Sequence, residues 1–569
     1  MDVSDGIKNI SLLWPDMAKK ENAMKKNKLS ENSYTDINLE RIVAEFAVDR
    51  PYTAYVKNIL TTLCEDPEVI NYRLDIIDNI LNCSKLQAAL GSIYSVASEA
   101  EKYTLPENID LPEVQKLAKS FRETDLFGNC LNRIRNVMLE YGDSFKAQGL
   151  CKLRDEVLKL SDQFSHTYGN NILSPEEDYS KPISITLGIN LDNQLRPTEA
   201  TIVSLNNVKY TRAPFLNRLI PNNKNDFESI YDFHSAKEGF LSEKLVKEVE
   251  EASESLVKID STALQLSLIS DLDRILKNSA NSLKFIIRRY TYTYSNFFIT
   301  LKFELLFILG VVAMIKKIRK LGLPMCRPKI ENRENKVFSV EGLYNINLAL
   351  NWTENKVDQI VKNDLTFNEH ENIFVLTGPN SGGKTTYINA ISQIQILCQA
   401  GMYVPGISAN ISPVDNVYTH FSAEEKRDTD YGRLGEEAKR INEIFKQATE
   451  YSLIILNESL ASTSPDECLY MSKDILYGLK LLNANAIFAT HQHELAANLD
   501  DKNSCYLGNG RLCSLVAGSE KQAIKSGDCF RRTYKVIKSP PLGTSYAKDI
   551  AESFGISYEQ IKSILSTRF

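Results

Sequence analysis

The sequence predicts an α/β domain with a largely parallel sheet, preceded by an all-α region that contains a small β-rich insertion. From about Gly342 to the end of the chain, short apolar strands alternate with helical segments, which is typical of parallel sheets. From Leu39 to about Tyr168, apolar residues recur at helical spacing. Residues 183–205 instead alternate apolar and polar residues around turn residues, which is the pattern of a β-hairpin.

These patterns divide the chain of 569 residues into five expected segments. They are a polar tail (1–35), a helical core or lever (36–180), a β-rich insertion (181–235), a helical lever return (236–340) and the α/β domain (341–569).

Composition places the chain among soluble globular proteins, with 43% hydrophobic and 25% charged residues. The net charge of −6 excludes a global basic field. Ten cysteines without a CxxC pair indicate reduced thiols, and the start of the chain has no apolar signal core, so we expect a cytoplasmic protein. Residues 297–315 resemble a membrane span, but Lys302 and Glu304 interrupt them, which favours a buried core helix and no membrane association.

Two stretches in the helical region have heptad-like spacing. Leu150, Leu153, Val157, Leu160 and Phe164 form the first, and a similar run extends from Leu245 to Leu266. Two ordinary core helices would show the same spacing. Because the stretches flank the β-rich insertion, an arm of paired helices with a β tip is the sharper expectation.

A phosphate-binding loop is the strongest motif. Residues 373–376 predict a buried strand, GPNSGGKT satisfies the pattern GxxxxGK[ST], and a helix face follows. Backbone N–H groups of such a loop surround phosphate oxygens, the lysine reaches the β and γ phosphates, and the hydroxyl after it binds Mg²⁺. The expected ATP-binding residues are Gly378, Pro379, Asn380, Ser381, Gly382, Gly383, Lys384, Thr385 and Thr386.

A second apolar strand, residues 453–456, ends in Asn457 and Glu458. In P-loop ATPases an acidic residue at this place helps hold Mg²⁺, and a neighbouring glutamate can polarise the attacking water. A third strand ends at His491, where a histidine can sense the γ phosphate, although a structural role is the plainer reading of that residue alone. We therefore expect Lys384, Glu458 and His491 as catalytic residues, with Thr385 and Asn457 at the metal.

The segments GPNSGGKTTY, NESLASTSPDE and FATHQHEL resemble the MutS family of ABC-type P-loop ATPases. The resemblance is strong over about 340–569 and moderate over about 38–335. It implies an α/β P-loop (ABC-type) ATPase domain joined to an all-α core and lever region, with ATP and Mg²⁺ as ligands and a homodimer as the active form.

Departures from the family pattern qualify this resemblance. No segment matches the mismatch-reading domain, the connector domain or an Smr tail, and Asn457 stands where the family has Asp. The signature loop, which in the family acts across the dimer through Ser or Thr, reads Tyr431–Gly432–Arg433 here, so Gly432–Glu436 are the candidates for that role.

Two functions remain open. One is a slow ATPase that binds structured DNA without mismatch readout, and the other is an ATP-gated scaffold that binds protein or ribosome. For DNA, the expected contact is the arm tip at 181–224. This segment contains only two acidic residues, Asp192 and Glu199. Its six basic residues, which could bind phosphates, are Lys181, Arg196, Lys209, Arg212, Arg218 and Lys224.

Overall fold

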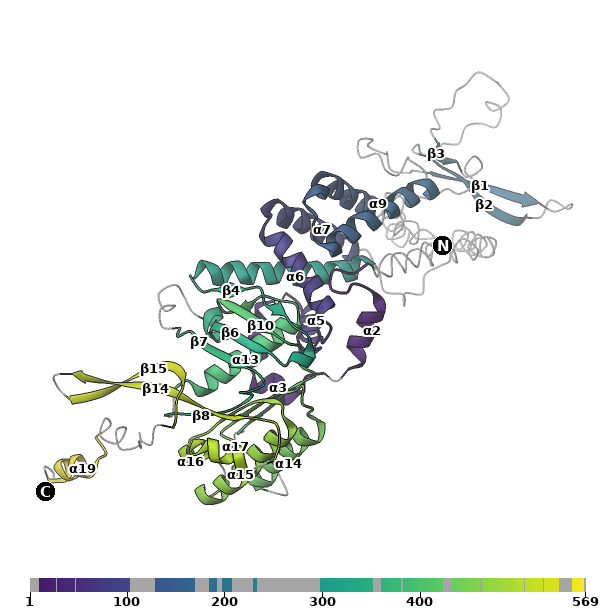
Figure 1. Ribbon diagram of the computed structural model, residues 1–569. Helices are drawn as coiled ribbons and strands as arrows, with labels where there is room; N and C mark the ends of the chain where they lie inside the picture. Colours follow the sequence, from purple (N-terminus) through teal and green to yellow (C-terminus); the bar gives the residue numbers. More distant parts are fainter. Residues whose placement is uncertain are drawn as a thin grey trace, which may run out of the picture. The chain divides into compact units, whose positions relative to one another are not determined.

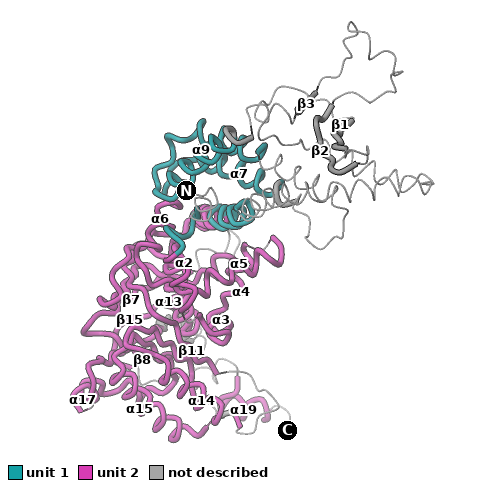
Figure 2. The backbone as a smooth tube through the Cα atoms, turned by 90° about the vertical axis from the view of Figure 1, so that its right-hand side faces the viewer, with its two compact units in different colours: residues 1–17, 78–309 teal, residues 18–77, 310–569 magenta. Residues whose placement is uncertain are grey.

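The computed structural model describes most of the chain, in two compact units. The described residues are 10–26, 28–46, 48–102, 128–168, 184–191, 197–206, 229–232, 297–351, 360–379, 382–422, 432–460, 463–505, 507–524, 527–541 and 555–566. Figure 2 colours the units, which are residues 1–17 with 78–309, and residues 18–77 with 310–569. The five segments expected from the sequence follow other bounds and stay a prediction.

Helices form the described core of the first unit. They are α7 (Ser84–Lys102), a helix over residues 128–141, the short 3₁₀ turn η1 (Gly142–Ser144) and α9 (Gln148–Tyr168). The five apolar residues of α9 that were expected to form a packing seam, from Leu150 to Phe164, are all at most 3% exposed. The matching run from Leu245 to Leu266 lies outside the described residues.

A three-stranded antiparallel sheet follows in the chain. Its strands are β1 (Ser184–Leu191), β2 (Pro197–Asn206) and β3 (Ser229–Asp232), in the order β1-β2-β3. The β1–β2 pair is the hairpin that the alternating sequence predicted. All six basic residues expected at the arm tip lie outside the described residues. They are Lys181, Arg196, Lys209, Arg212, Arg218 and Lys224.

The second unit is built on a six-stranded sheet in the order β11-β12-β13-β8-β14-β15. The first five strands are parallel. The sixth, β15, pairs antiparallel with β14 (Figure 1). Their bounds are β11 (Val417–Phe421), β12 (Leu453–Asn457), β13 (Asn485–Ala489), β8 (Ile373–Thr377), β14 (Leu512–Ile524) and β15 (Gly527–Lys538). Every residue of β8, β12 and β13 is buried, as expected for central parallel strands.

Helices cover this sheet. One face shares an apolar core with α14 (Gly432–Gln447) and α15 (Pro465–Leu482), and α13 (Lys384–Gln399) contacts β12 and β13. Ser464 caps α15 by accepting from the Glu467 N–H, and Gly401 follows α13 with φ +75°, an angle that suits glycine at a helix C-terminus. Short helices α16 (His493–Ala496) and α17 (Leu499–Cys505) come after β13.

Smaller elements complete the second unit. A four-stranded sheet has the order β5-β10-β6-β7, from β5 (Lys329–Ile330), β10 (Ser408–Ile411), β6 (Phe338–Leu343) and β7 (Asn363–Phe367). Beside these strands are β4 (Met325–Cys326), β9 (Val404–Pro405), η4 (Arg333–Asn335), α12 (Ile346–Asn351) and α19 (Tyr558–Ser566).

Residues from near the start of the chain pack onto the P-loop helix α13 in this unit. Gln393 Nε2 donates to the Ile37 carbonyl at 3.0 Å, and buried Arg73 donates to the Ala400 carbonyl at 3.1 Å. The helices of this N-terminal stretch are α2 (Met17–Lys25), α3 (Glu31–Asp36), α4 (Leu39–Glu45), α5 (Arg50–Thr61) and α6 (Pro67–Leu81).

One helix in the described part of the chain, Phe297–Lys320, is long and apolar enough to cross a membrane by length and composition alone. Of its most apolar window, 56% is buried inside the fold. The Glu304 carboxylate within it is buried and accepts from Ser11 Oγ at 2.5 Å and from the Leu12 N–H at 2.6 Å. A core helix passes the same test, so this helix is weak evidence for a membrane span.

Candidate active site

The phosphate-binding loop connects the carboxyl end of β8 to the first turn of α13. Two of its glycines have backbone angles that disfavour a side chain, with φ +144° at Gly378 and φ +90° at Gly383. A Cβ on Gly378 would lie 2.8 Å from the Ala517 Cβ, so the close approach of β14 also requires glycine. Asn380 and Ser381 lie outside the described residues.

Lys384 begins α13 and turns back over this loop. Its Nζ donates to the Gly378 carbonyl at 2.9 Å and to the Pro379 carbonyl at 3.2 Å, and lies 3.3 Å from His491 Nδ1. The side chain is 4% exposed. Burial lowers the pKa of Lys384, and the nearby Glu458 carboxylate opposes that shift. The ammonium is therefore held at the helix N-terminus, where a phosphate group would lie.

Asn457 is the last residue of β12 and lies beside Thr385, the residue that follows Lys384. Its Nδ2 donates to Thr385 Oγ1 at 3.3 Å. Its Oδ1 is buried and has no hydrogen-bond partner among the described residues. An amide oxygen and a hydroxyl are both hard oxygen ligands, and Mg²⁺ is commonly held by one or two protein oxygens together with phosphates and water. With the amide turned over, so that Oδ1 and not Nδ2 faces Thr385 Oγ1, the pair would offer two oxygens to Mg²⁺. The described residues hold no cluster of three or more His, Cys, Asp or Glu that could bind a metal by themselves.

Glu458 and His491 form a contact across neighbouring strands. Glu458 Oε1 lies 2.8 Å from His491 Nε2, and the Glu458 N–H donates to the Ala489 carbonyl at 2.9 Å. The hydrogen bond from His491 lowers the pKa of Glu458. If Nε2 holds the proton that Glu458 accepts, Nδ1 is free to accept from Lys384. One histidine thus links the lysine and the glutamate that the sequence indicated separately.

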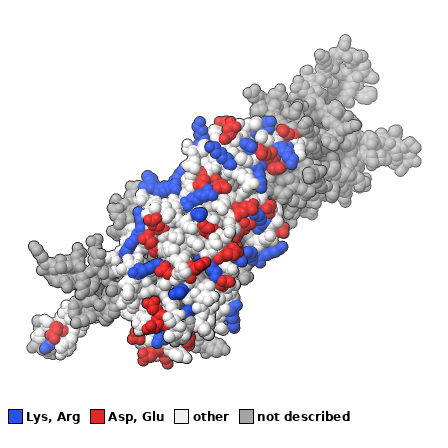
Figure 3. All heavy atoms as spheres, viewed as in Figure 1, with Lys and Arg blue, Asp and Glu red and all other residues white. Residues whose placement is uncertain are grey.

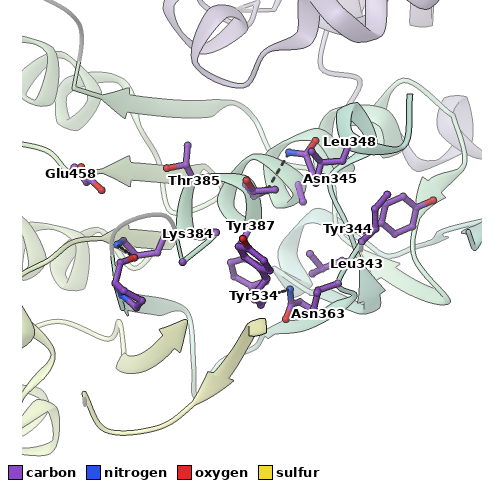
Figure 4. A pocket seen from close by; sticks show the side chains of 17 residues that line it. Leu343, Tyr344, Asn345, Leu348, Asn363, Lys384, Thr385, Tyr387, Glu458 and Tyr534 are labelled. Atoms are coloured by element: carbon purple, nitrogen blue, oxygen red, sulfur yellow. Dashed lines mark hydrogen bonds between the residues drawn. The ribbon is translucent and has the colours of Figure 1, made fainter. Parts of the chain in front are cut away.

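A cavity of about 410 Å³ extends from these residues. Figure 4 shows Glu458, Lys384 and Thr385 toward one side, Tyr344 and Leu343 toward the other, and Tyr534 between them. The remaining lining residues are Asn345, Leu348, Ile360, Val361, Asn363, Pro379, Gly382, Gly383, Thr386, Tyr387 and Ala390. The site thus has a polar, phosphate-binding part and a part with apolar and aromatic residues, which suits a nucleotide.

Tyr534 contributes to this cavity from β15, although sequence reasoning did not select it. It has φ +53° within a local irregularity of the β14–β15 pairing. A Cβ on Gly383 would lie 3.2 Å from its ring. Asn363 holds this backbone, since its Nδ2 donates to the Tyr534 carbonyl at 3.1 Å and its Oδ1 accepts from the Val536 N–H at 2.8 Å. A positive φ at a tyrosine depends on the fold, so the residue pattern gave no local signal.

The candidate signature loop is only partly described. Gly432 begins α14 with φ +63°, and Tyr431 and residues 423–430 lie outside the described residues.

On the face drawn in Figure 3, acidic and basic side chains are interspersed over the described surface. Neither finding tests the role of Gly432–Glu436 in a partner's site.

Two family models match the chain. One, described as MutS domain V, matches residues 374–538, and the other, described as the MutS2 N-terminal domain, matches residues 65–321. MutS domain V is a P-loop ATPase domain, in agreement with the loop and sheet described above.

Curated relatives match the same ATPase region. A DNA mismatch repair protein MutS from Prochlorococcus marinus (strain MIT 9301) is 35% identical over 138 residues, which is 24% of this chain and 15% of the relative. A DNA mismatch repair protein MutS 2 from Halobacterium salinarum is 33% identical over 141 residues, 25% of this chain and 16% of the relative. Human DNA mismatch repair protein Msh3 is 30% identical over 210 residues, 37% of this chain and 18% of the relative.

The matched segment spans less than a fifth of each of these relatives. The two family models nevertheless match separate parts of the chain, one in the helical region and one in the α/β domain. The chain belongs to the MutS family.

Proposed function

We propose that this protein binds ATP with Mg²⁺ at the site between β8 and α13 and hydrolyses it slowly as a homodimer. The supporting observation is the convergence of Lys384, the Thr385–Asn457 pair and the Glu458–His491 pair at the carboxyl ends of β8, β12 and β13. In MutS-family ATPases ATP and Mg²⁺ are the general ligands.

Each residue has a role in this proposal. The loop N–H groups and Lys384 bind the phosphates, the Tyr534 side of the cavity takes the base, and Glu458 orients and polarises the attacking water. Mg²⁺, held through Thr385 and Asn457, would neutralise phosphate charge. His491 holds Glu458 and can reach the γ phosphate. Gly432–Glu436 are proposed to complete the partner subunit's site.

We further propose that hydrolysis is coupled to binding of structured DNA through the segment 181–224. Its six basic and two acidic residues give this segment a surplus of positive charge in an acidic chain. Binding through phosphates is insensitive to sequence and weakens steeply with salt, because bound counterions are released.

The test of DNA binding is a triple variant, Lys209→Ala with Arg212→Ala and Arg218→Ala. It should bind branched and duplex DNA more weakly regardless of sequence, and the slope of log affinity against log salt should flatten by up to about three units. Basal ATP hydrolysis should be retained. An unchanged salt slope would remove this segment as the DNA contact, and a parent protein that binds no DNA at low salt would remove the DNA function.

A further inference from the structure

The turn after β12 that presents Glu458 has an unusual backbone. Glu458 has φ +50° and Leu460 has φ +65°, and neither is glycine. Side chains other than glycine rarely adopt such angles, and they persist only where surrounding contacts hold them. The orientation of the Glu458 carboxylate therefore depends on what fixes this turn.

Two buried contacts hold the turn beyond Glu458. Leu460 is fully buried and belongs to the apolar core between the sheet and α14 and α15. Ser459, between the two strained residues, is 3% exposed, and its Oγ lies 2.8 Å from Nδ1 of His420 on the neighbouring strand β11. The Ser459 hydroxyl can also donate to the His420 carbonyl, at 3.4 Å.

The protonation of His420 follows from its surroundings. The residue is fully buried, and burial together with the nearby Arg440 charge lowers its pKa to about 4, so the ring is neutral. Its Nε2 has no partner among the described residues. A bare buried acceptor costs less than an unpaired N–H, which places the proton on Nδ1. Nδ1–H then donates to Ser459 Oγ, and Ser459 donates to the His420 carbonyl, so both donors are used.

We propose that His420 and Ser459 are positioning residues that hold the strained turn and thereby orient Glu458 toward the attacking water. This inference rests on the ATPase activity proposed above. His491 and the Ala489 carbonyl fix Glu458 from the β13 side. The His420–Ser459 pair fixes the following residue from the β11 side. Loss of that second attachment should leave nucleotide binding intact and misdirect the carboxylate.

The experiment compares Ser459→Ala, His420→Phe and His420→Asn, each as the full chain. Asparagine can place an amide N–H near the position of Nδ1, whereas phenylalanine cannot donate. We expect Ser459→Ala and His420→Phe to lower kcat about tenfold, equivalent to roughly 1.4 kcal/mol, with unchanged KM and unchanged affinity for a fluorescent ATP analogue. His420→Asn should restore most of kcat.

The matched control is Ser392→Ala, because Ser392 is also fully buried but its hydroxyl bonds within α13, to the Ile388 carbonyl. Its kcat should equal that of the parent. The inference is overturned if Ser459→Ala hydrolyses at the parent rate, or if His420→Asn is as slow as His420→Phe. The comparison of His420→Phe with His420→Asn tests the proposal even if Ser459→Ala does not fold. A parent that binds but does not hydrolyse ATP overturns the proposed function itself, which distinguishes the two failures.

Discussion

The two ends of the central sheet differ in how their polar groups are satisfied. At the amino ends of the parallel strands, Asn372 Oδ1 accepts from the Arg511 N–H at 2.8 Å and its Nδ2 donates to Asn483 Oδ1 at 3.0 Å. Ser452, just before β12, donates to Asp415 at 2.7 Å. At the carboxyl ends, Thr377 Oγ1 and Asn457 Oδ1 are buried without partners among the described residues.

The two ends also differ in which residues have a positive φ. At the amino ends Asn483, just before β13, has φ +59°, an angle that asparagine tolerates. The positive φ angles of Glu458 and Leu460 lie directly after the carboxyl end of β12. Unsatisfied polar atoms and strained residues cost stability, and they concentrate where a protein must bind or react. The amino ends thus maintain the fold, whereas the carboxyl ends give up some stability to form the site. Substitutions at the carboxyl ends should therefore mainly affect the rate of hydrolysis, and substitutions at the amino ends should mainly affect the free energy of unfolding.

The largest expected effect is at Glu458. Glu458→Gln should lower kcat by about 10²–10⁴-fold, because the carboxylate that polarises water is lost while the site keeps its shape. ATP should still bind, and light scattering should show a dimer that accumulates with ATP.

Glu450→Gln is the matched control at the other end of the sheet, since Glu450 pairs with Lys336 away from the cavity. It should hydrolyse ATP at the parent rate. A monomeric Glu458→Gln protein with bound ATP would contradict the composite dimer site.

Asn457→Asp should have the next largest effect. A charged oxygen near Mg²⁺ is worth roughly 1–3 kcal/mol more than a neutral one, so hydrolysis should accelerate about fivefold or more if metal binding limits it. Steady-state rates across a Mg²⁺ titration measure this. An unchanged or slower rate would mean that the asparagine is fitted to this site.

Two strands of the central sheet, and the polar residues that follow them, could be predicted from local sequence. Residues 373–376 and 453–456 were expected as strands and are found in β8 and β12. Each is a short continuous apolar run bounded by polar or glycine-rich segments, which leaves few alternatives. Tyr534, Ser459 and His420 were not expected. Their positions depend on strand pairing and on backbone angles set by tertiary contacts, which no local pattern encodes.

Asn372→Ala tests the amino ends. It removes a buried amide that bonds to the Arg511 N–H and to Asn483. The free energy of unfolding should therefore fall by about 1–3 kcal/mol. The kcat of the folded protein should not change. Thermal unfolding and single-turnover hydrolysis measure the two quantities, and Asn509→Ala, at an exposed residue, is the control. A loss of kcat at unchanged stability would show that the amino ends of the strands also serve catalysis.

The smallest expected effect concerns pH and the buried His420 near the carboxyl end of β11. Burial lowers the pKa of His420 to about 4 in the folded protein, against about 6.5 for an unperturbed histidine. Between these two pKa values, histidine is protonated in the unfolded chain and neutral in the folded chain. The stability contributed by the neutral ring is therefore complete above pH about 6.5 and is lost as the pH falls toward 4. At pH 5.5 the loss should be about 1 kcal/mol. His420→Asn cannot titrate there, so its unfolding midpoint should fall less than the parent's between pH 7.5 and 5.5. Parallel pH profiles of the two proteins would show that His420 is not the buried neutral base described here.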